Sequence, residues 1–174
     1  MTSPDESAAP DEEILEQAYD EMRRLARRRL AQMGPQSIQA TELVNETWLR
    51  LMGQNRSWAD RGQLFGLAAR AMRDILVDRA RQKGSLKRGG DWERVNWESA
   101  LQIAGEHPEE LLMLDEAISR LSEQAPDHAK VVELMFFAGL TGYETAKALE
   151  VSPSTVDRQW RFARAWLHRE LTEG

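Results

Sequence analysis

Apolar residues recur at the spacing of an α-helix along most of this chain. Ile14, Ala18, Met22, Leu25 and Leu30 follow one another at intervals of three to five residues, which places them on one face of a helix. No stretch alternates with the period of two that a half-buried β-strand requires, so we expect an all-α fold. The same pattern predicts further helices over residues 41–52 and 63–82, from residue 109 to Pro126, from there to Gly139, and over residues 142–149 and 153–171.

The helical pattern is absent from two segments. Residues 1–10 combine two prolines with small and acidic residues, and we expect them to form a disordered acidic leader. Residues 84–108 contain four glycines and a proline without a sustained helical period, which is typical of a linker. The sequence therefore predicts two small helical bundles, residues 11–83 and 109–174, joined by an irregular linker over residues 84–108.

Charge is distributed unevenly, although the formal net charge is only −6. Residues 1–21 carry eight acidic groups and no basic one, whereas residues 22–90 carry fifteen Lys and Arg against five Asp and Glu. A basic block in an acidic protein favours a polyanionic partner. The chain has no cysteine, no signal peptide and no run of ~20 apolar residues, so we expect a cytoplasmic protein without membrane insertion.

The last two predicted helices carry the signals of a helix-turn-helix unit. Thr141 and Glu144 have the spacing of a capping box, and Ser152 followed by Pro153 is a typical start of a second helix. About three residues separate the two helices, as in a helix-turn-helix. Glu150 occupies the turn position where glycine is usual, because the chain tends to become left-handed there.

The final helix is expected to have one apolar and one basic face. On a helical wheel Val156, Trp160, Ala163 and Leu167 cluster within about 60° and form the core side. Short polar groups at the start of the other face, followed by arginines, are suited to the major groove of DNA. The alternative is a helical hairpin with a charged surface. The candidate DNA contacts are Ser154, Thr155, Arg158, Arg161 and Arg164.

Three segments together resemble a known family. They are ELVNETWLRLM (42–52), LFGLAARAMRDILVDRARQKGSLKRGG (64–90) and VVELMFFAGLTGYETAKALEVSPSTVDRQWRFARAWLHREL (131–171). In this order they resemble the small bacterial RNA polymerase sigma factors of the extracytoplasmic-function (ECF) type. The resemblance implies that the first domain binds core RNA polymerase and opens the −10 promoter element. It also implies that the second domain places its recognition helix in the −35 element.

The resemblance also assigns candidate site residues in the first domain. The polymerase-binding candidates are Glu42, Asn45, Glu46 and Arg50, although the three charged residues could instead form a helix-stabilising ladder of ion pairs. The loop 53–62 lies where the family captures an unstacked −10 base. There the candidates are Asn55, Arg56 and Trp58, with Arg70 and Arg73 for the phosphates of the strand; Trp58 packing into the bundle is an equal alternative.

The resemblance implies an alternative sigma factor that is monomeric when free, needs no cofactor or metal, and is not an enzyme. It leaves open whether a separate anti-sigma protein exists. One rival is a helix-turn-helix regulator that acts without binding core polymerase, and another is an inhibitor of a sigma factor. A nuclease or hydrolase is a third rival, disfavoured because the three histidines lack ligand spacing and because Asp74 and Asp78 have arginine neighbours. The histidines are His107, His128 and His168.

Overall fold

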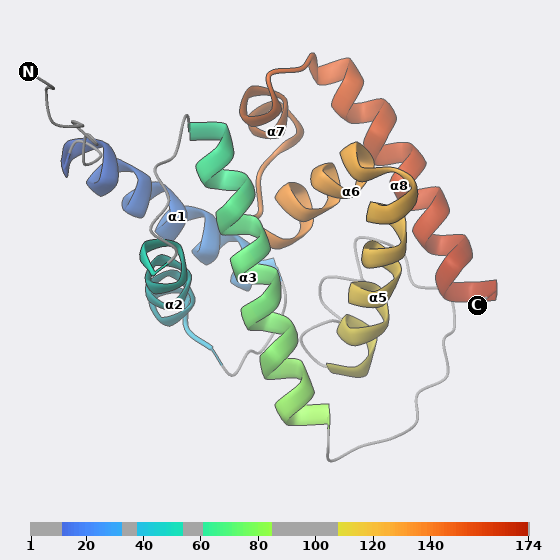
Figure 1. The fold of residues 1–174 in the computed structure, drawn as a ribbon, viewed down its shortest axis with the longest axis horizontal. Coiled ribbons are helices and arrows are strands. Elements are labelled where there is room, and N and C mark those ends of the chain that lie inside the picture. The colour runs from blue at the N-terminus through green and yellow to red at the C-terminus, as the bar shows by residue number, and fades with distance from the viewer. Residues whose placement is uncertain (1–11, 33–37, 54–60, 85–107, 174) are drawn as a thin grey trace, which may run out of the picture.

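The computed structural model describes residues 12–32, 38–53, 61–84 and 108–173 (Figure 1). All regular structure in these ranges is helical, with no strand among them, which confirms the predicted all-α fold. The expected leader and nearly all of the expected linker lie outside them. The elements are α1 (Glu12–Gln32), α2 (Ala40–Met52), α3 (Arg61–Gly84), α5 (Pro108–Gln124), α6 (Pro126–Val132), the π-helical segment η1 (Glu133–Phe137), α7 (Gly142–Leu149) and α8 (Pro153–Glu173).

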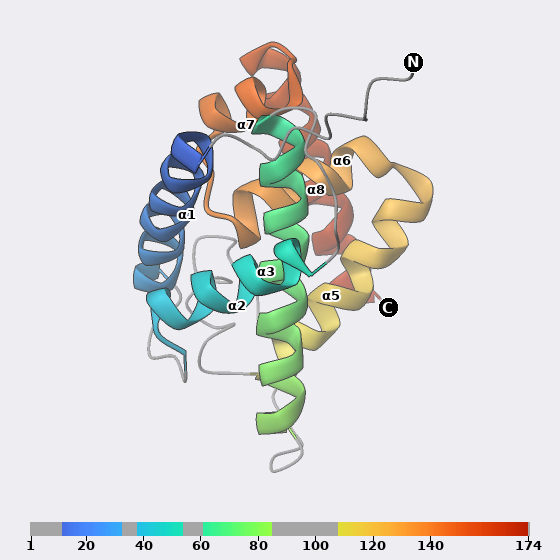
Figure 2. The same ribbon diagram turned by 60° about the vertical axis from the view of Figure 1, so that its left-hand side comes forward.

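The first three helices pack through apolar faces, including the face of α1 that the sequence pattern predicted. Helix α2 packs against both α1 and α3 and crosses in front of α3 in Figure 2. Met22, Leu43 and Ile75 are completely buried among them. The ring of Trp48 on α2 lies edge-on to Tyr19 on α1, with 5.7 Å between the ring centroids. We refer to α1, α2 and α3 as the N-terminal helices.

The remaining elements form a second group, the C-terminal helices α5 to α8 with η1. Helix α8 runs along the outer side of this group in Figure 1 and packs against α5, α6 and α7. Ile118 and Leu121 on α5 and Leu167 on α8 have no exposed surface. The breaks lie at Ala125, directly before Pro126, and over residues 138–141, which include Gly139, close to where the sequence predicted them.

Helix α3 joins the two groups. It contacts α2 on one side and α5, η1 and α7 on the other, so one continuous cluster of buried side chains spans the described residues. The helical period places Leu64, Ala68, Ala71, Ile75 and Leu76 on the core face of α3, and all five are buried. Phe65, Met72 and Val77 are buried as well. A helix covered on both sides loses the one-sided pattern of a surface helix. The division into two domains remains a prediction, because the described residues share this core.

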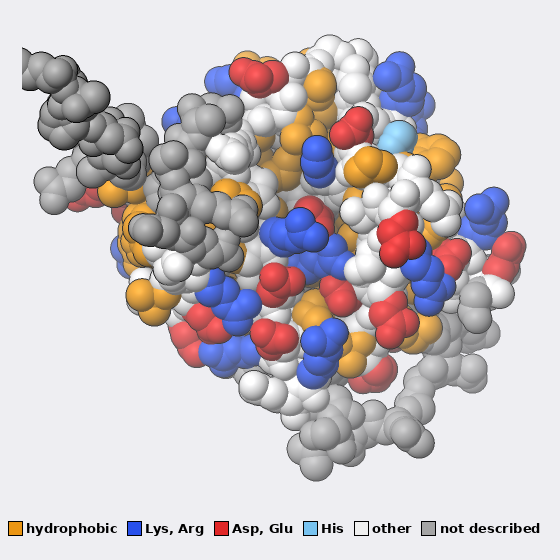
Figure 3. Space-filling model, in the orientation of Figure 1, with side chains coloured by type: hydrophobic (Ala, Val, Ile, Leu, Met, Phe, Trp, Pro, Cys, Tyr) orange, Lys and Arg blue, Asp and Glu red, His pale blue; other side chains and the backbone are white. Residues whose placement is uncertain are grey.

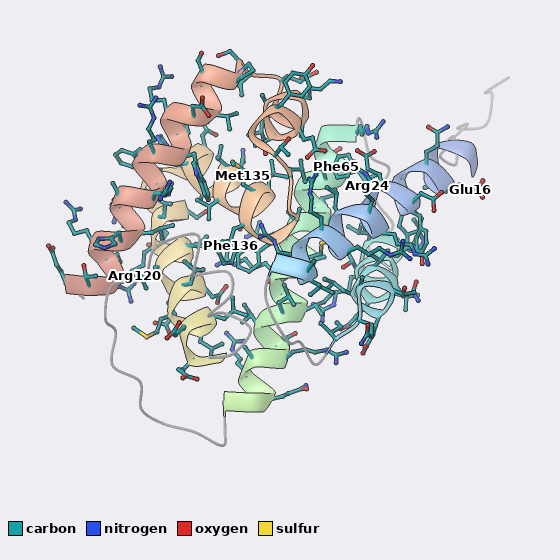
Figure 4. All side chains as sticks on the ribbon, turned by 180° about the vertical axis from the view of Figure 1, so that it is seen from behind. Glu16, Arg24, Phe65, Arg120, Met135 and Phe136 are labelled. Carbon is teal, nitrogen blue, oxygen red and sulfur yellow. The ribbon has the colours of Figure 1, made fainter. Side chains whose placement is uncertain are left out.

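The segment η1 gives the chain between α6 and α7 its particular shape. The wider turn places two consecutive aromatic side chains, Phe136 and Phe137, in the interior with 2 % and 0 % of their surface exposed. Figure 4 shows Met135 and Phe136 on the segment that faces the end of α1, with Phe65 of α3 beside α7. The sequence predicted a helix here but not its π-helical geometry. Such turns often occur at functional positions.

Candidate nucleic-acid and polymerase interfaces

The turn between α7 and α8 has the helix-turn-helix geometry that the sequence predicted. The Thr141 amide donates to Glu144 Oε2 (2.7 Å) and the Glu144 amide donates to Thr141 Oγ1 (3.2 Å), which is a complete capping box. Glu150 adopts the left-handed conformation (φ 55°, ψ 40°) that was expected at this turn position, although it is not a glycine. The Thr155 amide donates to Ser152 Oγ (3.2 Å), which caps the start of α8.

The inner face of α8 fixes its rotation about its own axis. Val156, Ala163 and Leu167 are buried. Trp160 is half-buried and packs against the continuous core and against a second, small cluster formed by Val131, Ala146 and Val156. These are the four residues that the helical wheel predicted. The tryptophan side of α8 therefore faces the protein, and the arginine side faces outward.

The outer face of α8 presents donors to solvent. Ser154, Arg158 and Arg161 are exposed, and Arg164 is half-buried. None of the three arginines forms an ion pair with a carboxylate of the described residues, and Arg161 donates from Nε to the backbone oxygen of Asp157 at 3.3 Å. Thr155 is half-buried, and its hydroxyl lies 2.8 Å from Ser152 Oγ, so it also supports the cap.

One carboxylate lies among these arginines. Asp157 is exposed on the first turns of α8, and a Cβ atom placed at Gly142 would lie 3.9 Å from Asp157 Oδ1. Asp157 is therefore close to the first residue of α7. An acidic group near a helix N-terminus is favourable, because the helix dipole is positive there.

The four predicted polymerase-binding residues lie on α2 and remain accessible. Glu42 and Asn45 are exposed, whereas Glu46 and Arg50 are half-buried. Arg50 contacts Glu46 (3.2 Å), as the ladder alternative required, but Glu42 and Glu46 also pair with Arg79 of α3. The Tyr19 hydroxyl donates to Asn45 Oδ1 at 2.5 Å. These contacts hold the side chains on one side of α2 in place, and Glu42 and Asn45 stay exposed to solvent there.

The predicted −10 contacts are only partly described. Asn55, Arg56 and Trp58 lie outside the described residues. Arg70 is exposed on α3, as expected. Arg73, which the sequence grouped with Arg70 as a phosphate contact, is buried instead: only 7 % of its surface is exposed, because Asp115 and Glu133 of the C-terminal helices pair with it.

Two further arginines connect the N-terminal and C-terminal helices. The sequence pattern alone assigned them no role. Arg28 donates through Nε to the carbonyl oxygen of Gly139 (2.9 Å) and through Nη2 to Glu144 Oε2 (2.6 Å). Arg29 is 1 % exposed and donates to the carbonyl oxygen of Met135. The sequence did hold a signal for them: five arginines lie between residues 23 and 29, so some of them must lie beside the apolar face of α1.

These contacts shift two pKa values. Burial, together with the adjacent charge of Arg28, lowers the pKa of Arg29 to about 9, so the side chain stays charged at neutral pH. Burial opposes ionisation of Glu144, but hydrogen bonds from the Thr141 amide and from Arg28 outweigh it and lower its pKa to about 2. Both groups are therefore charged in the folded protein at neutral pH.

The described residues contain no group of histidine and acidic side chains arranged to hold a metal ion. Asp78 pairs with Arg50 (3.4 Å) and Arg81 (3.8 Å), as its arginine neighbours suggested. The ring of His128 lies 4.6 Å from that of Phe162, and His168 is exposed. Among the described helices, none is both long and apolar enough to cross a membrane.

Among the described residues, an outward arginine face on the helix that follows a capped tight turn is the arrangement typical of helix-turn-helix DNA-binding proteins. A comparison with protein families is more specific, because the model of the ECF sigma factor family matches residues 2–173. The chain belongs to the ECF sigma factor family. It is an alternative sigma factor that directs promoter-specific transcription with RNA polymerase, and this family is not a catalytic one. No curated protein and no solved structure matches it.

Proposed function

We propose that this sigma factor reads the −35 element with the outer face of α8. One observation carries the proposal: Arg158, Arg161 and Arg164 have no ion pair with a described carboxylate, while the opposite side of α8 is packed into the protein. The N-terminal residues of a recognition helix contact base edges, and later cations bind phosphates. Arg158 is the candidate for a guanine, since its planar fork matches O6 and N7.

In the same proposal, α2 docks on core RNA polymerase. The candidates on α2 are held in place by Asp78 and Arg79 of α3 and, for Asn45, by Tyr19 of α1. They are Glu42, Asn45, Glu46 and Arg50. Side chains that are held before binding lose less conformational entropy on docking. This arrangement supports a preformed polymerase contact.

In the same proposal, the start of α3 and the loop before it open the −10 element. Arg70 is exposed and is suited to a strand phosphate. Asn55, Arg56 and Trp58 are assigned to the unstacked base by the family resemblance alone. We further propose residues 11–83 and 109–174 as the two functional domains of a cytoplasmic protein that is monomeric when free.

Transcription with purified core polymerase on genomic DNA fragments tests the proposal, with start sites mapped by sequencing. We expect initiation only when the protein is present. Arg158→Ala should lower initiation and relax the preference at one base pair by about 1–3 kcal/mol, whereas Arg161→Ala should weaken DNA binding without changing sequence preference. Lys130→Ala, exposed on α6, is the control. Equal start-site selection by wild type and Arg158→Ala would contradict the assignment.

Binding to immobilised core polymerase tests the role of α2. Glu46→Ala should weaken binding, because it removes a carboxylate from the docking side. Asp78→Asn is the comparison variant, since it removes the other carboxylate that pairs with Arg50 and leaves Glu46 in place. Equal loss in both variants would mean that Glu46 acts through Arg50. Sequence-specific DNA binding without any affinity for core polymerase would instead favour a helix-turn-helix regulator.

A further inference from the structure

A large apolar side chain on the outer face of α8 is not accounted for by the polar contacts proposed for that face. Phe162 has 49 % of its surface exposed and lies on the side that also carries Ser154, Arg158 and Arg161. Because Phe162 follows Arg158 by four residues, the two side chains are neighbours on the helix surface. Exposed apolar residues are common on protein surfaces, so a role for Phe162 has to come from its surroundings.

The ring of Phe162 is oriented by a second helix. Its centroid lies 4.6 Å from that of the His128 ring on α6, with 57° between the two ring planes. His128 is half-buried, and α6 packs against α8 along the described residues. Part of the phenylalanine ring therefore rests on the protein while the remainder faces solvent. A side chain that is held in this way loses less conformational entropy when a partner binds.

The surroundings of Phe162 are basic. Arg158, Arg161 and Arg169 are exposed on the same side of α8. Figure 3 shows Lys and Arg side chains along the edge of the molecule that α8 forms, with hydrophobic surface between them. The core of a protein–protein interface is depleted of charged residues, whereas surfaces that bind DNA are polar and strongly basic. The charge around Phe162 therefore favours DNA as the partner of this side chain.

The major groove of DNA offers an apolar side chain a specific target, the C5 methyl group of thymine. The other groups on the base edges there are hydrogen-bond donors and acceptors. A phenylalanine ring cannot pair with them, and covering them would leave polar atoms without hydrogen-bond partners, which is costly. The ring of Phe162 therefore matches an A·T pair and disfavours a G·C pair at the position that it covers.

The separation of Phe162 from Arg158 limits where such a thymine can lie. Four residues of an α-helix rise by about 6 Å and complete slightly more than one turn, so the two side chains project in nearly the same direction. Successive base pairs are about 3.4 Å apart along the DNA axis. The base pair that Phe162 reaches is therefore about two steps from the base pair that Arg158 reaches.

We propose that Phe162 reads the methyl group of a thymine in the −35 element, about two base pairs from the guanine contacted by Arg158, and that His128 positions the Phe162 ring. The inference rests on the proposed role of α8 at the −35 element. It adds a base contact that depends on apolar surface rather than on hydrogen bonding. The promoters of this sigma factor should therefore carry an A·T pair at a fixed distance from the G·C pair that Arg158 reads.

Deoxyuridine provides the test, because it pairs as thymine does and lacks only the C5 methyl group. Holoenzyme assembled from core polymerase and the full chain is titrated with fluorescent duplexes that carry a −35 element mapped by transcription. Each thymine of the element, on either strand, is replaced in turn by deoxyuridine. One replacement, about two base pairs from the guanine that depends on Arg158, should weaken binding about fourfold, as expected for one buried methyl-sized group. Mapped elements without an A·T pair at that distance overturn the inference.

Variants of Phe162 separate a base contact from a structural role. Phe162→Ala should bind the thymine and deoxyuridine duplexes equally, about fourfold more weakly than wild type binds the thymine duplex. Phe162→Leu keeps an apolar side chain and should retain part of the methyl dependence, with unchanged helical circular dichroism. His128→Ala should reduce the methyl dependence, because the ring of Phe162 loses its support. Met113→Ala, which removes an exposed apolar side chain from α5, should behave as wild type.

The outcomes distinguish this inference from the proposed function. Equal binding of all duplexes by wild type, with a guanine preference that still depends on Arg158, overturns the reading of thymine and leaves the proposed function intact. A methyl dependence that persists in Phe162→Ala overturns it as well, because another side chain would then contact the methyl group. Weaker binding of Phe162→Ala to core polymerase without DNA assigns the ring to a protein contact and also overturns it. A holoenzyme without any sequence preference at the −35 element overturns both proposals.

Discussion

The contact between Glu144 and Arg28 predicts a specific dependence of stability on pH. Glu144 accepts a hydrogen bond from the Thr141 amide (2.7 Å), pairs with Arg28 (2.6 Å) and lies 3.5 Å from Arg24. It therefore joins the start of α7 to α1. Protonation of its carboxyl group removes the negative charge from both contacts.

The size of the effect follows from the pKa. The pKa of Glu144 falls from 4.5 to about 2 in the folded protein. The shift corresponds to about 3 kcal/mol, and solvent screening of a side chain that is 27 % exposed reduces the expectation to about 2 kcal/mol. Because the folded-state pKa is the lower one, this stabilisation is present above pH 4.5 and is lost as the pH falls towards 2.

Urea unfolding followed by tryptophan fluorescence measures this effect in wild type and Glu144→Gln. At neutral pH the variant should have a free energy of unfolding lower by about 2 kcal/mol, and the difference should shrink below pH 4.5. The control Glu116→Gln, whose side chain is 71 % exposed, should differ from wild type by less than about 0.5 kcal/mol throughout. A difference for Glu144→Gln that is independent of pH would refute the assignment to the carboxylate charge.

Further substitutions test the backbone and the core, each by urea unfolding. Gly139→Ala should destabilise the protein by about 1–2 kcal/mol, because φ is +75° and the new Cβ would lie 3.3 Å from Arg29 Cβ. Gly66→Ala should instead stabilise it by about 1 kcal/mol, because Gly66 lies within α3 and a Cβ there would meet no atom within 4 Å. Glu150→Gly should stabilise by up to about 1 kcal/mol, since it relieves the left-handed conformation at φ 55°. Leu167→Ala, at 0 % exposure, should cost about 2–5 kcal/mol, and Leu49→Ala, at 70 % exposure, should cost less than about 0.5 kcal/mol.

Each of these expectations has a result that contradicts it. Equal effects at Gly139 and Gly66 would mean that the conformation and close approach at Gly139 carry no cost. A neutral or destabilising Glu150→Gly would place the strain of the turn elsewhere. Similar losses for Leu167→Ala and Leu49→Ala would contradict the orientation of α8 on which the proposed −35 contact depends.

Local sequence signals were sufficient for the helices and for the turn before α8. The starts of α7 and α8 depend on Thr141, Glu144 and Ser152, whose side chains bond to amides within three residues. Interactions of such short range do not need the rest of the fold. The inner face of α8 was equally predictable, because helical periodicity alone assigns Val156 and Leu167 to one side.

The position of Arg73 shows where local pattern stops being informative. Arg70 and Arg73 occupy the same basic helix, yet Arg70 is exposed and Arg73 is buried. The difference comes from Asp115 and Glu133, more than forty residues further along the chain. A charged side chain is buried only when its partners are present, and those partners are supplied by the packing of other helices on α3.

By itself the sequence determined the all-α fold, the helix-turn-helix and the outward face of α8, because these follow from periodicity and from contacts between near neighbours. Only the tertiary structure decided that the C-terminal helices cover α3 and take up Arg28, Arg29 and Arg73. The physical reason is that residues distant in sequence must come together before a buried charge can be neutralised. No local pattern shows which of the many carboxylates of the chain will provide that neutralisation.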